Sequence, residues 1–186
     1  MFSAFRKISR QPLLLLALAL LISFLFAGCA AQCISQTSFN RSLIEGENVQ
    51  RVAVLSFESP PDDPQAGSHI SQLFEMHLLS TGLYRISERG GVEKALRELG
   101  FNKSVGVNPA TLRQLRELIQ VDGLILGSVS HYNRVNFGFT ARLVSLKSGL
   151  VLWSVSQTGG RILRPLSQVA DESVEAAVKD LQSKIR

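Results

Sequence analysis

The chain is poor in the residues and motifs that most often carry chemistry. Its 186 residues include two cysteines, three histidines and one tryptophan. The stretch GSVSH at 127–131 lacks the last glycine of a Gly-x-Ser-x-Gly nucleophile elbow, and GFNKSVG at 100–106 lacks the Gly-Lys-Ser/Thr of a phosphate loop. The sequence therefore predicts no catalytic residue, no cofactor and no small-molecule substrate.

Histidines and a carboxylate gather at one place only, where His69, Glu75 and His77 follow one another. Zinc-binding helices place two histidines four residues apart, so that both side chains point the same way. Eight residues apart, as here, they diverge by about 80° on an ideal helix. We predict no metal site, a half-buried His77 and a solvent-facing His69. A hydrolase that uses His77 or His131 with a nearby serine is the alternative from a different class.

A long uncharged run occurs only near the start, from Leu13 to Phe26, and Arg6, Lys7 and Arg10 precede it. This layout is typical of a secretory signal. The run has about 14 residues, whereas a membrane-spanning helix needs roughly 20. A retained N-terminal anchor is therefore the less favoured alternative.

The segment Phe26-Ala27-Gly28-Cys29 resembles the lipobox of bacterial lipoproteins. The resemblance implies cleavage after Gly28 and acylation of Cys29, which anchors the mature chain in the membrane through its lipid. Ala30 favours the outer membrane, because the known inner-membrane retention signal places Asp after the acylated cysteine. Acylated Cys29 has no thiol left for Cys33, which is then either a free thiol or part of an intermolecular bridge.

Removal of residues 1–28 also removes the charge excess. The remaining 158 residues carry seventeen basic and fifteen acidic side chains, a net charge of about +2, with no Lys/Arg cluster. Nucleic acid is therefore excluded as a partner. A chain of this length forms one domain.

The pattern of apolar residues predicts a signal at 1–28, an acylated cysteine with a flexible tether at 29–49, and a domain at 50–186. Period-two segments predict strands and period-3.6 segments predict helices. The expected strands are 51–57, 83–87, 123–132, 135–146 and 150–156. The expected helices are 67–81, about 91–99, 109–119 and 165–184. The order β-α-β-α-α-β-β-β-α predicts an α/β (α+β) fold, a mixed sheet of about five strands flanked by helices.

Three polar or aromatic features have ordinary structural interpretations. Glu58, Asp62 and Asp63 form an acidic, proline-rich loop that we interpret as solvated, although it is able to engage a partner. The pair Gly90-Gly91 can bind an anion through its N–H groups, but a strand-to-helix turn is the simpler interpretation. Trp153 is predicted to lie in the core.

Four stretches together resemble the periplasmic domain of CsgG-type lipoproteins, which are related in fold to the N-terminal domain of TolB. They are RVAVLSFES, GLYRISERGGVEKALRELGF, NPATLRQLRELIQVDGLILGSVSHY and FTARLVSLKSGLVLWSVSQTG, within residues 51–159. In the curli-secretion members, subunits form a ring and each adds hairpins to an outer-membrane barrel. Such strands need about 9 to 11 residues each, and neither 132–135 nor 159–164 has that room.

The resemblance implies a non-enzymatic lipoprotein of the outer membrane that faces the periplasm and serves as an assembly or secretion accessory. Its partner is an envelope protein or a second copy of itself. Two alternatives stay open: a curli-type secretion-ring subunit without its own membrane hairpins, and a penicillin-binding-protein activator of the LpoB type. Accessory lipoproteins of the FlgO type share the same general fold.

Overall fold

The computed structural model describes residues 34–39, 45–100, 109–133, 135–160 and 164–185. All of them belong to one compact unit, Cys33–Arg186. Cys29 and Gly28, the predicted lipidation and cleavage residues, and Cys33 lie outside the described residues.

The described chain contains six strands and four longer helices. In chain order these are β1 (Ile34–Phe39), β2 (Arg51–Val54), α3 (Ala66–Thr81), β3 (Arg85–Ile86), α4 (Arg89–Glu98), α5 (Pro109–Ile119), β4 (Gly123–Tyr132), β5 (Asn136–Ser145), β6 (Val151–Gly160) and α6 (Leu166–Ile185). The predicted order of elements is therefore confirmed from β2 onward.

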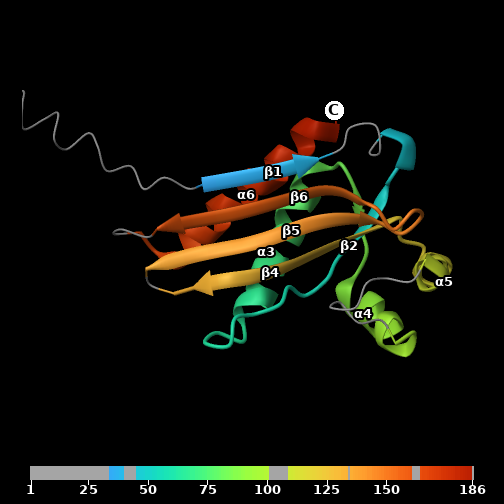
Figure 1. Cartoon of the computed structure of the whole chain (residues 1–186), viewed down its shortest axis with the longest axis horizontal. Helices are drawn as coiled ribbons and strands as arrows, with labels where there is room; N and C mark the ends of the chain where they lie inside the picture. Colours follow the sequence, from blue (N-terminus) through green and yellow to red (C-terminus); the bar gives the residue numbers. More distant parts are fainter. Residues whose placement is uncertain (1–33, 40–44, 101–108, 134, 161–163, 186) are drawn as a thin grey trace, which may run out of the picture. The chain divides into compact units, whose positions relative to one another are not determined.

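All six strands form one sheet in the order β1-β6-β5-β4-β2-β3 (Figure 1). β2 is parallel to both β3 and β4. β4, β5, β6 and β1 are antiparallel neighbours. The sheet is mixed, as predicted, with a parallel part at one side and a long antiparallel meander at the other.

Helices α3 and α6 cover one face of the sheet (Figure 1). α6 contributes a continuous buried stripe, namely Val169, Ala170, Ser173, Val174, Ala177, Val178 and Leu181. This is the spacing of an amphipathic helix with one face in the core. α3 ends at Gly82, whose φ of 63° is left-handed and whose N–H bonds the carbonyl of Leu79. The helix therefore ends where the predicted range 67–81 ends.

Helices α4 and α5 cover part of the opposite face. They pack Val92, Ala95, Leu96, Leu112 and Leu115 against Leu124, Leu126 and Val144 of the sheet. This second cluster is smaller than the first, and it occupies only the end of the sheet where β2 and β4 begin. No helix of the described ranges lies on the remainder of that face.

The segment Val121-Asp122-Gly123 joins α5 to the buried strand β4. The Asp122 carboxylate accepts hydrogen bonds from the backbone N–H groups of Gln50 (3.2 Å) and Arg51 (3.0 Å). It therefore fixes the start of β2 beside the start of β4.

Residues 34–39 differ from the prediction, because they form a strand within the segment assigned to the flexible tether. β1 pairs with β6 over six residues, from Ile34 opposite Thr158 to Phe39 opposite Trp153. The segment ISQTSF has little hydrophobic alternation, so its sequence alone gives a weak strand signal. Backbone hydrogen bonds to β6, at the edge of the antiparallel meander, stabilise this strand. The sheet therefore has six strands, where about five were expected.

Three large apolar side chains are exposed, although the apolar pattern of their segments would place them in the core. Leu118 on α5 is 58% exposed, Val135 before β5 is 66% exposed and Val151 on β6 is 47% exposed. Val151 is displaced because the β5–β6 register shifts between Leu143 and Val144, and such a bulge changes the face to which side chains point. The Trp153 prediction is confirmed, since its side chain is fully buried.

Candidate functional site

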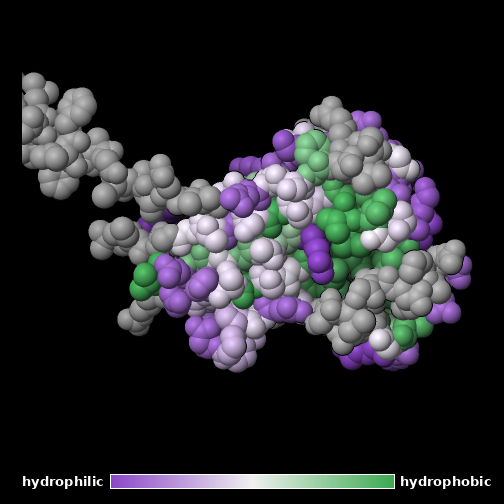
Figure 2. All heavy atoms as spheres, in the orientation of Figure 1, coloured by the Kyte–Doolittle hydropathy of each residue, from purple (hydrophilic) through white to green (hydrophobic). Residues whose placement is uncertain are grey.

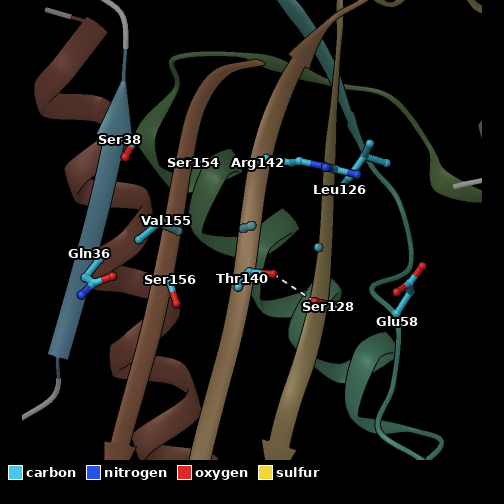
Figure 3. A pocket seen from close by; sticks show the side chains of 12 residues that line it. Gln36, Ser38, Glu58, Leu126, Ser128, Thr140, Arg142, Ser154, Val155 and Ser156 are labelled. Carbon is cyan, nitrogen blue, oxygen red and sulfur yellow. Dashed lines mark hydrogen bonds between the residues drawn. The ribbon is translucent and has the colours of Figure 1, made fainter. Parts of the chain in front are cut away.

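The uncovered part of the sheet is the main candidate for an interaction surface, and we name it the open sheet face. It lies on β1, β6, β5 and β4, on the side away from α3 and α6 (Figure 3). A shallow groove of about 430 Å³ runs over it. Its side chains are Gln36, Ser38, Ser128, Thr140, Arg142, Ser154 and Ser156.

Strand alternation creates this surface. In β5, Phe139, Ala141 and Leu143 are buried against α3 and α6, whereas Thr140 and Arg142 are exposed on the other face. Successive side chains of a strand point to opposite faces, so every second residue of β4, β5 and β6 reaches the open sheet face. Figure 2 shows this face as a largely pale, weakly hydrophilic surface, with hydrophobic atoms toward the end where α4 and α5 pack.

The open sheet face carries little charge. Five of its seven side chains are hydroxyls, one is an amide, and Arg142 is its single cation. Few charged residues and an arginine are features shared with many protein interfaces, although serine is usually depleted there. A hydrogen bond of 2.9 Å joins Ser128 and Thr140 across β4 and β5. This hydrogen bond pairs two of the hydroxyls, whereas the other polar groups need hydrogen-bond partners on whatever covers the surface.

Arg142 is exposed and extends from β5 across β4 toward Leu126 (Figure 3). Among the residues that the structure describes, it has no ion-pair partner. Glu58 borders the groove from the loop beside β4. Its backbone extends the sheet, since Glu58 N–H bonds the carbonyl of Gly127 at 2.9 Å and Val129 N–H bonds the carbonyl of Glu58 at 2.8 Å.

Strand β1 gives the open sheet face a free edge. It is the outermost strand of the sheet, and its segment ISQTSF contains neither a charged residue nor proline. Charged residues and proline are the usual protection of an edge against pairing with another strand. The edge and the adjoining face therefore form one continuous surface on which an extended segment of another chain can pack.

The histidines do not assemble a hydrolase site. His77 Nε2 contacts Asp171 Oδ1 of α6 at 2.9 Å, so the pair joins two helices. The nearby Ser80 hydroxyl donates instead to the carbonyl of His77 at 2.7 Å. His131 lies exposed beside the Ser130 hydroxyl at 3.2 Å. Neither arrangement places a serine, a histidine and a carboxylate in series.

The predicted cluster of His69, Glu75 and His77 is divided among three different partners. His69, which is half-buried and not fully solvent-facing as expected, contacts the Tyr132 ring edge-on at 6.0 Å between centroids. Glu75 forms an ion pair with Arg89 at 2.9 Å. Within the described parts of the chain, no group of three metal-binding side chains occurs.

The start of α4 is occupied by a residue of its own chain. The Glu88 carboxylate caps the helix by accepting hydrogen bonds from Gly90 N–H (2.6 Å) and Gly91 N–H (2.7 Å). These two hydrogen bonds hold the pKa of Glu88 below its usual value. The Gly-Gly pair is therefore a strand-to-helix turn, and its N–H groups are not available to an external anion.

The acidic loop has a structural role at one of its carboxylates. Asp63 Oδ1 accepts a hydrogen bond from Gln65 N–H at 3.1 Å, just before α3 begins. Burial, together with the charge of Asp63, raises the pKa of Tyr132. This loop therefore lies at the same end of the domain as the turn between β4 and β5.

No helix within the described ranges is both long enough and apolar enough to cross a bilayer.

The sequence did contain the signal for the open sheet face, namely serines and threonine at every second position of three strands. This pattern does not identify Arg142 as a binding residue, because a single arginine in an alternating strand also occurs on an ordinary solvated face.

Comparison with known proteins supports the predicted resemblance. A family model of the curli production assembly/transport component CsgG matches residues 49–139. No curated protein sequence is significantly similar to this chain.

Solved structures share the fold. PelC from Paraburkholderia phytofirmans, solved as a dodecamer, has a TM-score of 0.56 at 19% identity, over 81% of this chain and 98% of its own. The lipoprotein GNA1162 from Neisseria meningitidis has a TM-score of 0.53 at 19% identity, over 73% of this chain and 99% of its own. The domain is CsgG-like in fold.

Proposed function

We propose that this protein is a non-catalytic lipoprotein of the bacterial outer membrane that helps to assemble an envelope complex, with its CsgG-like domain in the periplasm. The signal-like start, Cys29 at the end of a lipobox and the CsgG-like fold support the location. The absence of a serine, histidine and carboxylate series among the described residues supports a binding role over a hydrolytic one.

The open sheet face is the observation that carries the binding role. It combines a surface that carries little charge, an Arg142 side chain without an ion-pair partner in the described chain, and an edge at β1 without charged residues or proline. A partner that offers a carboxylate to Arg142 gains a charge-assisted hydrogen bond. The lipid on Cys29 holds the domain near partners in the same membrane, which raises their effective concentration.

Crosslinking in intact cells, followed by affinity purification of the full chain, tests this function. Wild-type protein is compared with Cys29→Ala, which removes the lipid, and with Arg142→Glu, which reverses the central charge. Arg97→Glu is the matched control, because Arg97 is an exposed arginine on α4, away from the open sheet face.

We expect one main crosslinked partner with the wild-type protein and with Arg97→Glu. Its yield should fall about tenfold or more with Arg142→Glu, since the substitution removes one charged contact and adds a repulsive one. We expect the Cys29→Ala protein, which has no lipid, to leave the membrane and to lose the partner. Equal yields from all four proteins would contradict the proposal.

A secretion-ring or assembly-ring subunit is the second candidate, because PelC, whose fold this domain shares, was solved as a dodecamer. A ring needs a head-to-tail interface between two different surfaces of each subunit. Native mass measurement of the full-length protein in detergent distinguishes the two candidates. A closed ring that Arg142→Glu dissociates favours the ring, whereas a monomer that binds a different protein favours the adaptor.

A further inference from the structure

We propose that two copies of this protein pair edge to edge through strand β1, in antiparallel orientation, so that their two sheets join into one. The occupant of the free edge is therefore a second copy of this chain. The inference extends the proposed function, because β1 borders the open sheet face. It does not depend on acylation of Cys29.

The two edges of the sheet differ in protection. β3, at one edge, has only the two residues Arg85 and Ile86, and Arg85 is exposed. β1, at the other edge, has six residues, and none of them is charged or a proline. Short length and charge are devices that prevent an edge strand from pairing with another chain. β3 has both of them and β1 has neither.

The outer side of β1 has backbone groups that another strand can bind. β1 pairs with β6 on its inner side, and no other described strand pairs with it. In an antiparallel ladder, every second residue directs its N–H and C=O groups away from its neighbour. Ser35, Gln36, Thr37 and Ser38 are all exposed, so no charged side chain of β1 stands beside these groups. An incoming antiparallel strand can therefore extend the ladder.

The sequence of β1 is compatible with its own copy. A twofold axis perpendicular to the sheet aligns two β1 strands antiparallel and keeps both open sheet faces on one side. Residues that lie opposite one another must then point to the same face, which allows two central registers: Gln36 opposite its copy or Thr37 opposite its copy. In both registers the central pairs consist of amide and hydroxyl groups, which can bond across the strands. No like charges are brought together.

Helix α6 has a polarised charge pattern beside this edge. It lies next to β1 on the covered face (Figure 3), where Lys184 Nζ is 5.1 Å from the centre of the Phe39 ring. Since α6 follows β6 and returns along it, its first half lies toward the Ile34 end of β1 and its second half toward the Phe39 end. The first half carries three carboxylates and no cation, whereas the second carries two lysines and one aspartate: Asp171, Glu172 and Glu175, then Lys179, Asp180 and Lys184.

The twofold axis makes the two α6 helices complementary. It brings the acidic half of one helix level with the basic half of the other, and it sets the two helix dipoles antiparallel. Glu172 and Lys184 are separated by about 18 Å along the helix, which matches the length of roughly 17 Å for β1. Glu172, which also pairs with Arg164 of its own chain, is thus level with Lys184 of the second copy. A foreign strand would need to bring this charge pattern, whereas a second copy already has it.

Pairing leaves the proposed binding surface uncovered. Arg142 is on β5, and β6 separates β5 from β1. The two open sheet faces then adjoin each other across the paired β1 strands, so one pair presents two binding surfaces to an envelope complex. A six-residue ladder is a small interface. We therefore expect a dissociation constant of about 1–100 µM.

Native mass measurement of the full-length protein in detergent, over a range of protein concentrations, tests the pairing. Gln36→Lys and Gln36→Glu each place one charge near the centre of β1, where it lies opposite or diagonal to its own copy in the two registers. Gln114→Lys is the matched control, because Gln114 is an exposed glutamine on α5, and the helix α5 packs elsewhere on the sheet.

We expect the wild-type protein and Gln114→Lys to convert from single chains to pairs as the concentration rises. Gln36→Lys alone and Gln36→Glu alone should each raise the dissociation constant about tenfold or more, because like charges meet. An equal mixture of these two variants should restore pairing, because a lysine then meets a glutamate. A structural defect or a foreign partner would not produce this restoration.

Three outcomes of this measurement would overturn the inference. The first is a wild-type protein that remains a single chain up to roughly 100 µM. The second is a ring larger than a pair, and the third is a mixture of the two charged variants that pairs no better than either variant alone.

Hydrogen exchange of the wild-type protein gives a second readout that needs no substitution. The amides of β1 should exchange several-fold more slowly at high protein concentration than at low concentration, because the second copy covers its outer side. Exchange that does not depend on concentration would contradict the pairing.

The outcomes separate this inference from the proposed function. Arg142→Glu should still form pairs, since Arg142 is two strands away from β1. A protein that stays a single chain but retains its crosslinked envelope partner overturns only the pairing. A protein that forms pairs but yields no envelope partner overturns the proposed function and leaves the pairing standing.

Discussion

The two faces of the sheet have opposite compositions, although the same strands build both. On the face covered by α3 and α6, Trp153, Phe137 and Phe139 are at most 1% exposed. On the open sheet face, the same strands present serines, a threonine and Arg142. The covered face stabilises the fold, and the open sheet face is the surface that we propose binds a partner. The difference teaches that substitutions one residue apart should separate stability from function.

Trp153→Ala should give the largest effect. It removes the largest fully buried side chain of the covered face and the hydrogen bond from Trp153 Nε1 to Asp180 Oδ2 at 3.0 Å. We expect the free energy of unfolding to fall by about 3–5 kcal/mol, as measured by chemical denaturation. Ser154→Ala, one residue along on the open sheet face, should change it by less than about 0.5 kcal/mol. Similar losses from both substitutions would contradict the comparison.

Gly67→Ala tests the packing of α3 onto the covered face. A Cβ atom at residue 67 would clash with the Phe57 carbonyl oxygen and lie 2.7 Å from Ser59 Oγ. The helix must then shift, and we expect unfolding to require about 1–3 kcal/mol less free energy. At Gly46 a Cβ atom meets nothing within 4 Å, so Gly46→Ala is the control. A Gly67→Ala protein as stable as this control would show that α3 is loosely packed.

Ser128→Ala on the open sheet face should have a small effect. It removes the cross-strand hydrogen bond with Thr140, and such exposed pairs contribute about 0.2–1 kcal/mol. Thermal unfolding measures the change. A loss comparable to that of Gly67→Ala would mean that the open sheet face is structural and not reserved for a partner.

Glu88→Ala should give a small, pH-dependent effect at the helix that limits the open sheet face. The pKa of Glu88 is lowered in the folded state by the N–H groups of Gly91 and Gly90. A depressed pKa stabilises the fold above the unfolded value of about 4.3, and that stabilisation is lost as the pH falls through the folded value. The melting temperatures of wild type and variant should therefore differ at pH 7 and converge in acid.

The control for this pH dependence is Glu98→Ala, an exposed glutamate at the other end of α4. Its melting temperature should follow that of the wild type throughout. A Glu88→Ala difference that persists unchanged at low pH would assign the effect to helix propensity and not to the carboxylate.

Much of the fold could be predicted because its elements carry strong local signals. The buried stripe of α6 and the alternation of Phe137, Phe139, Ala141 and Leu143 match the sequence pattern residue by residue. The end of helix α3 at Gly82 also has a local cause, since its left-handed φ of 63° favours glycine.

The remaining features depend on contacts that are distant in sequence. β1 exists because β6 offers a ladder more than a hundred residues away. Val151 leaves the core because of a bulge that no local motif announces. Arg142 becomes a candidate only once the structure shows that none of the described helices covers its part of the sheet. A propensity pattern contains none of this information.

Strand β1 also determines how the domain responds to force. Any pull on the chain ahead of Ile34 acts along a strand that is joined to β6 by six residue pairs. The load is directed along the strands, so the hydrogen bonds of this ladder resist it in shear and share it, instead of opening one after another. The edge strand is therefore a mechanical clamp between the folded domain and whatever holds its N-terminal end.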